Sequence, residues 1–375
     1  MALKVFHTAD VHLGMKFSSY HEAKELLTEA RFEAFERCVR AANDTKCNLF
    51  VVSGDLFERV SIAKTDIVRA AETLSRFEGD CACVLPGNHD YYTPGRDELW
   101  SVFRESCGGK VELLTQQREY PLTHYDIDAS IFPAPCHAKT SDKNVIGWIK
   151  EKASLSDARY RIGVAHGSLE GISPDFDKRY YPMSKDELLS CGVDLWLLGH
   201  THTPHPATRE QETVIFYPGT PEPDGFDRTH GGNAWIIDLD EQKKIAFEPV
   251  PTGKYRFLHE TCALREEGDL DTMKSQFSSG EYEKTLLKLA LTGSLPRDLY
   301  GTVSGILRDI EDHVFFLHHP VDRSGLREEI TAEDIGSEFT EGSFPYRLLM
   351  KLTEADDNIA LQVAYEIVRE ASRDR

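Results

Sequence analysis

The chain has 375 residues, of which 40% are hydrophobic and 28% are charged, and its formal net charge is −20. This length suggests two or three domains, and the composition is typical of a soluble globular protein rather than a disordered one. A protein that holds DNA mainly through its phosphates usually has a basic surplus. The acidic balance therefore argues against strong nonspecific DNA binding by the chain alone.

The eight cysteines are scattered and form no CxxC pair, so neither a zinc knuckle nor a disulfide framework is indicated. Buried, reduced thiols are the simplest interpretation. No apolar run approaches the length of a membrane span. The first ten residues, MALKVFHTAD, enter a strand pattern without a signal-peptide core. We therefore expect a cytoplasmic protein without a membrane segment.

The first 250 residues repeat a short apolar run followed by a polar cluster. Six runs show this pattern: LKVFHTADVH, NLFVVSGDLF, CACVLPGNHD, RIGVAHGS, VDLWLLGHTH and TVIFYPGTPE. Continuous apolar runs of this length predict strands buried on both faces. Amphipathic helices are predicted over residues 63–77 and between the first two runs, where the helical spacing is that of Leu27, Phe32, Phe35 and Val39. Alternating strands and helices predict an α/β domain with covered sheets.

From about residue 256 the pattern changes. A strand candidate, EKTLLKLALTG, is followed by a helix candidate, LYGTVSGILRDIEDH, and by VFFLHHPVD, which together predict a small α+β unit. Residues 328–342 are acidic and are expected to form a loop, and residues 344–369 predict a final stretch of helix. We expect a first domain at 1–255, a small α+β domain at 256–335, and a linker with a C-terminal helical segment at 336–375.

Each predicted core strand before residue 203 ends in a potential metal ligand. An isolated Gly-Asn-His-Asp would be explained best as turn chemistry, but five polar clusters at strand ends predict one shared site, because ligands in α/β folds bind there. The adjacent glycines allow sharp turns that face the side chains toward a cleft. The candidate residues are Asp10, His12, Asp55, Asn88, His89, His166, His200 and His202.

The chemistry of this set indicates two metal ions. Carboxylates, an amide and imidazoles without thiolates suit Mn²⁺, Fe²⁺ or Zn²⁺ and argue against a closed structural zinc site. Leaving His89 aside, seven ligands are too many for one tetrahedral ion. They suit two ions about 4 Å apart that share a carboxylate, the arrangement for in-line attack on a phosphoryl centre.

The motifs D-x-H, GD, GNH[DE], HG and GHxH, in this order, resemble those of the calcineurin-like metallophosphoesterases over about residues 3–250. The resemblance implies a four-layer αββα sandwich. It also implies a non-ligand catalytic role for His89, which would stabilise the phosphoryl oxygens or protonate the leaving oxygen. The implied ligands are Asp10, His12, Asp55 and His202 for the first ion, and Asp55, Asn88, His166 and His200 for the second. Asp90 is expected to orient His89, and a solvated turn carboxylate is the alternative.

The longer motifs FHTADVHLGMKF, GDLFE, LPGNHDYY, GHTHTPH and YPGTPE look like those of SbcD-type DNA-repair exonucleases, relatives of the meiotic-recombination nuclease. This resemblance implies Mn²⁺ as the metal, with Fe²⁺, Zn²⁺ or Mg²⁺ as alternatives, and a DNA-capping role for residues 256–335. It implies an SbcC-type ATPase partner for the C-terminal helix, and leaves a homodimer open. Glu58 departs from the pattern, because many archaeal and eukaryotic members have His there, so exonuclease polarity does not carry over.

We thus predict a metal-dependent DNA exonuclease or endonuclease of DNA repair that acts with an SbcC-type ATPase. The alternative is a phosphodiesterase for small or cyclic nucleotides, which uses the same seven ligands and agrees better with the acidic charge. The roughly 120 residues after the first domain favour the nuclease. A scaffolding subunit with a vestigial site would be expected to lack a ligand, and none is missing.

Overall fold

The computed structural model describes residues 2–208, 212–228, 230–318, 325–355 and 358–373. Contacts between residues divide the chain into two compact units, Met1–Phe257 and Leu258–Arg375. Among the described residues, no helix is both long enough and apolar enough to cross a membrane.

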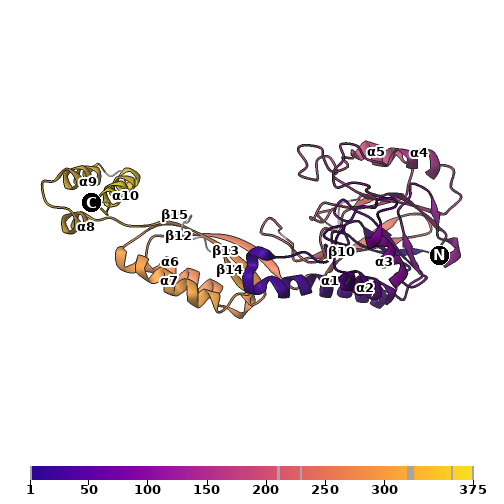
Figure 1. Ribbon diagram of the computed structural model, residues 1–375, viewed down its shortest axis with the longest axis horizontal. Coiled ribbons are helices and arrows are strands. Elements are labelled where there is room, and N and C mark those ends of the chain that lie inside the picture. The colour runs from indigo at the N-terminus through magenta and orange to yellow at the C-terminus, as the bar shows by residue number, and fades with distance from the viewer. Residues whose placement is uncertain (1, 209–211, 229, 319–324, 356–357, 374–375) are drawn as a thin grey trace. The chain divides into compact units, whose positions relative to one another are not determined.

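The first unit contains two sheets (Figure 1). The six-stranded sheet has the order β11-β10-β1-β2-β3-β4, and its strands are β1 (Leu3–Thr8), β2 (Leu49–Ser53), β3 (Cys81–Leu85), β4 (Val111–Leu113), β10 (Asn233–Leu239) and β11 (Ile245–Pro251). The five-stranded sheet has the order β5-β6-β7-β8-β9, and its strands are β5 (Tyr120–Pro121), β6 (Ala129–Ala134), β7 (Tyr160–His166), β8 (Leu195–Gly199) and β9 (Ile215–Phe216). Strands β1 to β4 are parallel to one another, as are β6 to β9.

Helices cover the outer face of each sheet, which gives the first unit four layers. One core lies between the two sheets and includes Val5 and Val51, whereas their neighbours Phe6 and Phe50 face the helices. Strands with apolar side chains on both faces need cover on both sides. The six-stranded sheet is covered by helices α1 (Lys24–Asp44), α2 (Lys64–Ser75) and α3 (Glu98–Ser106). The five-stranded sheet is covered by helices α4 (Gly147–Ala153) and α5 (Lys185–Ser190). Short 3₁₀ segments are η1 (Ser18–Ala23) and η2 (Thr123–Tyr125). The predicted α/β class is confirmed.

The second unit combines a small sheet with helices, as the sequence predicts for this region. Its strands are β12 (Arg256–Leu264), β13 (Thr285–Leu295), β14 (Phe316–His318) and β15 (Gly325–Glu328), and both β14 and β15 pair in parallel with β13. Helices α6 (Glu267–Phe277) and α7 (Arg297–Glu311) pack on this sheet through Phe277, Leu307 and Ile310, and a 3₁₀ turn, η3, spans Gly280–Tyr282.

Three helices end the chain: the helical stretch expected over 344–369 is present, whereas the loop and linker expected before it are corrected. The acidic segment 328–342, expected to be a loop, contains α8 (Ala332–Glu338), because Thr331 and Asp334 form a capping box. The helical stretch expected over 344–369 consists of α9 (Phe344–Glu354) and α10 (Asn358–Arg373). Ile335 of α8 packs with Leu349 and Leu361 of the two following helices, so α8 belongs to the terminal bundle rather than to a linker.

Candidate metal centre

The carboxyl ends of five parallel strands bring the predicted site residues together. Loops that follow β1, β2 and β3 in one sheet meet the ends of β7 and β8 in the other. The loops are bonded directly to one another: the backbone N–H of His12 donates to the Asp55 carbonyl (3.0 Å), and that of Asp10 donates to the Gly54 carbonyl (3.1 Å). Across the two sheets, the backbone N–H of His200 donates to the Asp10 carboxylate (3.0 Å). All eight predicted residues therefore belong to one cluster of loops.

Four of the predicted ligands have left-handed backbone conformations. The φ angles are 53° at Asp10, 49° at His12, 52° at Asp55 and 99° at His200. Non-glycine residues rarely adopt these angles, and each costs on the order of 1–3 kcal/mol unless the surrounding structure enforces it. Strain of this kind gathers at functional sites, where it aims side chains that an unstrained turn would direct elsewhere.

Two glycines are required by close packing around the ligands. A Cβ atom at Gly87 would lie 2.2 Å from a carboxylate oxygen of Asp55, and one at Gly54 would lie 2.0 Å from Nδ1 of His166. Gly54 also has φ +95°, whereas Gly87 has ordinary φ. The turning role predicted for the glycines therefore holds at Gly54, and at Gly87 the absence of a side chain makes room for Asp55.

The first donor cluster joins Asp10, His12 and His202. Nδ1 of His202 lies 2.7 Å from Asp224, and Nδ1 of His12 lies 3.0 Å from Glu58. These carboxylates favour the ring protons on Nδ1, which leaves the two Nε2 lone pairs facing each other 3.1 Å apart. Nε2 of His202 is also 3.8 Å from Asp10 Oδ1. Lone pairs so close repel each other, and either a proton on one nitrogen or a metal cation between them relieves the repulsion.

The second donor cluster joins Asp55, Asn88, His166 and His200. Nδ1 of His166 donates to the Ser53 carbonyl (2.9 Å), so its Nε2 faces Asn88 Oδ1 at 3.0 Å and Asp55 Oδ2 at 3.2 Å. Nδ1 of His200 lies 3.1 Å from the same Asn88 oxygen. Asp55 Oδ2 is also 3.8 Å from His12 Nε2, so this carboxylate contacts both clusters.

The pKa values of the ligand side chains are set by their burial and by the charges of their neighbours. Burial alone would lower the pKa of His166, but the Asp55 carboxylate outweighs it and raises that pKa to about 9. Burial would likewise raise the pKa of Asp55, yet His166 and His12 hold it below its usual range. Burial, and then the neighbouring His166, lowers the pKa of His200 to about 3. Without a metal, a proton on His166 therefore stabilises the Asp55 charge, a task that a divalent cation performs when bound.

Together, the two clusters fit two divalent cations. Imidazole nitrogens, carboxylates and a neutral amide oxygen lie 3.0–3.8 Å from one another. The outer nitrogens of His166 and His202 are hydrogen-bonded to oxygen atoms, and that of His12 lies against the Glu58 carboxylate. Ligating histidines in metal sites show this second contact, which fixes the tautomer and the ring orientation. Among the described residues, three groups of side chains could each hold an ion, because the ligand atoms within a group all lie within 4.8 Å of one another. These groups are Asp10–His12–His202, Asp10–Asp55–His166 and His12–Asp55–His89.

His89 and Asp90 have different surroundings from those predicted. Nδ1 of His89 lies 3.0 Å from the carbonyl oxygen of Glu58. The carboxylate of Asp90 instead accepts the backbone N–H groups of Gly87 (2.7 Å) and Phe57 (2.9 Å). The expectation that Asp90 orients His89 is therefore corrected. Asp90 is fully buried and fixes the loop that carries Asn88 and His89, because both of its oxygens accept from the backbone.

Sequence reasoning missed three residues that support the ligands. Glu58 was noted only as a departure from the family pattern, and Asp224 lies two residues beyond the quoted YPGTPE motif. Arg31 is buried on the apolar face of α1 and donates to the carbonyls of Val11 (2.7 Å) and Asp10 (3.3 Å). In the sequence, Arg31 lies four positions from both Leu27 and Phe35, on the apolar face of the predicted helix. A basic residue on that face is the pattern from which a buried role for Arg31 could have been predicted.

The donor clusters open into a cavity of about 720 Å³. Among the described residues that line it are Asn88, His89, His200 and His202, together with Lys139 and Arg228. The volume is in the usual range for a ligand site. Two cationic side chains beside the donors suit an anionic substrate group such as a phosphate.

Residues 3–204 match the family described as calcineurin-like phosphoesterases. The chain belongs to this family. A member of the family is a hydrolase of phosphoesters that uses two divalent metal ions, in agreement with the two donor clusters. The predicted family and enzyme class are thereby confirmed.

Individual relatives of this phosphoesterase are similar over its first unit. An uncharacterized metallophosphoesterase, YhaO, from Bacillus subtilis is 26% identical over 248 residues, which is 63% of this chain and 57% of that one. The DNA double-strand break repair protein Mre11 from Methanopyrus kandleri is 27% identical over 234 residues, 59% of this chain and 49% of that one. The matched region therefore spans only about half of these relatives. Among solved structures, the calcineurin-like phosphoesterase YfkN from Bacillus subtilis is 14% identical, with a TM-score of 0.42 over 66% of this chain and 90% of that one.

Proposed function

We propose that this phosphoesterase is a metal-dependent DNA nuclease of DNA repair that acts with an SbcC-type ATPase in the cytoplasm. The observation that carries the proposal is the pair of donor clusters that share Asp55 at the base of an open cavity. The similarity to proteins named DNA double-strand break repair protein Mre11 supports DNA as the substrate.

The proposed metal sites follow the two clusters. Asp10, His12 and His202 would hold one ion, Asn88, His166 and His200 would hold the other, and Asp55 would contact both. The mixed nitrogen and oxygen donors suit Mn²⁺, Fe²⁺ or Zn²⁺; the resemblance to SbcD-type nucleases favours Mn²⁺, with Fe²⁺, Zn²⁺ or Mg²⁺ as alternatives. When bound, a two-metal site supplies an activated water and charge stabilisation for in-line displacement at phosphorus.

The protein's own groups complete the proposed reaction. Because Nδ1 of His89 lies against the Glu58 carbonyl, its Nε2 is available to a phosphoryl or leaving oxygen in the cavity. Lys139 and Arg228 line the same cavity and would bind the anionic ester. Asp90 and Arg31 would keep the ligand loops in place.

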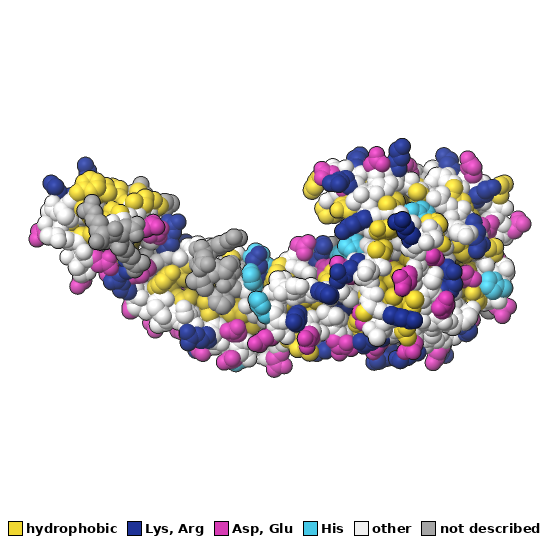
Figure 2. All heavy atoms as spheres, viewed as in Figure 1, with side chains coloured by type: hydrophobic (Ala, Val, Ile, Leu, Met, Phe, Trp, Pro, Cys, Tyr) yellow, Lys and Arg dark blue, Asp and Glu magenta, His cyan; other side chains and the backbone are white. Residues whose placement is uncertain are grey.

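The second unit is proposed to contact DNA through residues 256–335 and the ATPase through the terminal helices. Apolar side chains gather on the surface of the terminal bundle (Figure 2), and the exposed ones include Phe344, Val363 and Ile367. Exposed apolar patches of this kind indicate protein–protein contact, which a homodimer would also satisfy.

The acidic charge favours a second candidate, a phosphodiesterase for small or cyclic nucleotides. A net charge of −20 is unfavourable for a long polyanion but matters little for a small ester. Purified chain with Mn²⁺, and separately with Mg²⁺, should be incubated with linear duplex DNA, single-stranded DNA, a cyclic nucleotide and a generic phosphodiester. Cleavage of DNA supports the nuclease, and hydrolysis confined to the small esters supports the second candidate.

The shared carboxylate supplies a mutational test of the metal assignment. Asp55→Asn should remove both ions or leave one weakly held, because the bridging charge offsets the repulsion between two cations. Elemental analysis of the purified variant measures this directly. Normal occupancy of two metals per chain would contradict the shared-ligand arrangement.

A further inference from the structure

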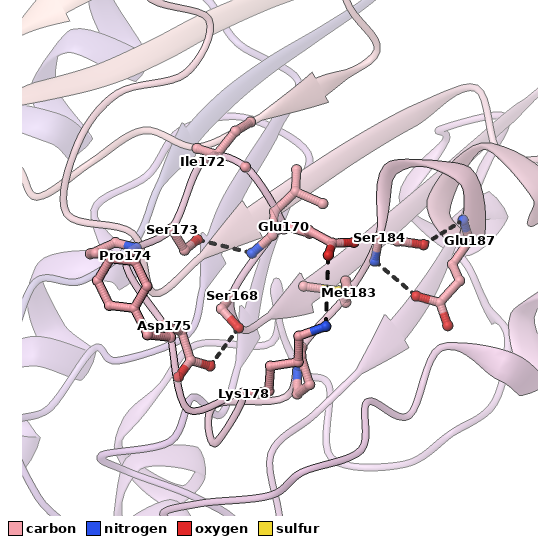
Figure 3. Close-up of a pocket in the computed structure, with 14 residues that line it drawn as sticks. Ser168, Glu170, Ile172, Ser173, Pro174, Asp175, Lys178, Met183, Ser184 and Glu187 are labelled. Carbon is pink, nitrogen blue, oxygen red and sulfur yellow. Dashed lines mark hydrogen bonds and ion pairs between the residues drawn. The ribbon is translucent and has the colours of Figure 1, made fainter.

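A second cavity adjoins the metal site. It has a volume of about 580 Å³ and is formed by the loop between β7 and α5 (Figure 3). The segment Gly171–Asp175 lines both this cavity and the metal-site cavity, so it forms a ridge that the two share. The loop begins directly after His166, at the end of β7.

The ridge is fastened to the loop that carries the metal ligands. The hydroxyls of Ser173 and Thr201 are 2.5 Å apart, and Thr201 lies between His200 and His202. The ring of Tyr180 lies against that of His200, with their centroids 5.0 Å apart. The second cavity therefore has a defined place beside the proposed position of the scissile phosphate.

The wall of the second cavity is largely apolar. Its described lining residues include Leu169, Ile172, Pro174, Phe176, Pro182 and Met183. Phe176 is 94% exposed, although a phenyl ring gains about 2–3 kcal/mol when it is buried. A ligand in the cavity that covered this ring would therefore be stabilised by the contact.

The polar groups of the second cavity already have partners within the loop. Asp175 accepts from the Ser168 hydroxyl (2.8 Å), and Glu170 lies 3.6 Å from the ammonium of Lys178, as Figure 3 shows. Ser184 and Glu187 form a capping box. The described lining residues thus include three carboxylates and one ammonium. This balance disfavours a phosphate and suits a flat, uncharged ring.

We propose that this second cavity binds a nucleobase next to the scissile phosphate, with the base stacked on Phe176. Stacking on an aromatic side chain needs an unpaired base and tolerates any base, so the substrate bound here is single-stranded or frayed DNA. The inference rests on the proposed function, because the metal site supplies the phosphate position from which the base reaches this cavity.

Two chromogenic esters with the same leaving group isolate the contribution of the base. They are thymidine 5′-(4-nitrophenyl phosphate) and methyl 4-nitrophenyl phosphate, assayed with the full chain and Mn²⁺. We compare kcat/KM for the thymidine ester with kcat/KM for the methyl ester and take their ratio. Phe176→Ala should lower this ratio by about tenfold, because the stacking of one base on an aromatic ring contributes a free energy that corresponds to about this factor. Phe176→Trp should keep the ratio. Leu155→Ala, which removes an exposed apolar side chain outside the described lining of the cavity, is the matched control.

Binding without hydrolysis separates this inference from the proposed function. Single-stranded oligothymidylate should quench the indole fluorescence of metal-free Phe176→Trp beyond the change seen in the wild-type chain, whose four tryptophans give the background. If neither ester is hydrolysed, the proposed function fails, and quenching alone decides the nucleobase site. An unchanged ester ratio in Phe176→Ala, or quenching equal to the wild-type background, overturns the inference.

Discussion

At the scale of single residues, His89 differs from the carboxylate-bound His12 and His202 because its Nδ1 contacts a backbone carbonyl, that of Glu58. The ring centroid of His89 is 4.8 Å from that of His12. The ring is also close enough to His12 and Asp55 to serve as a ligand. Its chemical role therefore needs a measurement that separates metal binding from proton transfer.

We expect His89→Ala to retain both metal ions and to lose hydrolysis by about 10²-fold or more, as the removal of a general acid or a charge stabiliser should. Elemental analysis together with the rate on a small phosphodiester tests this. Loss of metal in parallel with activity would show that His89 is a ligand.

Glu58 gives a second prediction at this scale. Its carboxylate lies 3.0 Å from Nδ1 of His12, and its carbonyl lies 3.0 Å from Nδ1 of His89, so one residue contacts both rings. Glu58→Gln keeps the carbonyl contact but weakens the carboxylate contact, and it should lower metal affinity by about 10- to 100-fold. Asp224→Asn is the matched variant on His202. Metal titration followed by calorimetry measures both affinities, and wild-type affinity in both variants would contradict the supporting role of these carboxylates.

At the scale of elements, Glu222 joins α1 to the last segment of the first unit. Its carboxylate accepts the backbone N–H groups of Lys254 and Tyr255, both at 2.8 Å, and the guanidinium of Arg37 at 3.1 Å. Burial raises the pKa of Glu222 from 4.5 to about 7, although these donors oppose the shift. The protonated carboxyl therefore contributes stability that is fully present below pH 4.5 and is lost as the pH rises through about 7.

We expect the free energy of unfolding to fall by about 2–3 kcal/mol between pH 5 and pH 8 because of this group, since one pKa unit corresponds to about 1.4 kcal/mol. Glu222→Gln should remove that part of the pH dependence, because the amide does not titrate. Denaturant titrations of both proteins at four pH values test the difference. Glu33→Gln, which loses a contact with the Lys254 ammonium, is the control. Parallel pH profiles for the wild type and Glu222→Gln would contradict the prediction.

At the scale of the whole molecule, the net charge of −20 limits what the chain can do alone. Basic and acidic side chains alternate over the visible face of the first unit (Figure 2). We therefore expect weak DNA binding, because few cations are free to contact phosphates and the net negative charge repels a polyanion. Filter binding at several salt concentrations measures this. Tight binding would contradict it.

The two units allow hydrolysis and assembly to be separated. A chain that ends at residue 330 lacks α8 to α10 but keeps all eight proposed site residues, which lie before residue 203. It should hydrolyse a small chromogenic ester at the wild-type rate, fail to co-purify with an SbcC-type ATPase and process long duplexes more slowly. A truncated chain that still binds the ATPase and degrades duplex DNA normally would refute the role proposed for the terminal helices.

The sequence by itself determined the α/β class and the positions of the donor residues, because both depend on local order. An apolar run that forms a strand covered on both faces must place the residues after it at the sheet edge. Asp55 follows β2 and Asn88 follows β3 for this reason. Helix α8 was missed because its one buried apolar side chain, Ile335, left no periodic pattern to detect.

Only the tertiary structure decided how the donors are held. Asp224 reaches His202 from 22 residues away and Glu58 reaches His12 from 46 residues away, contacts that no local pattern indicates. The same holds for Asp90, whose neighbour in sequence is His89 but whose oxygens accept from the backbone of Gly87 and Phe57. Side-chain partners depend on how loops from different strands pack, and sequence spacing does not specify that packing.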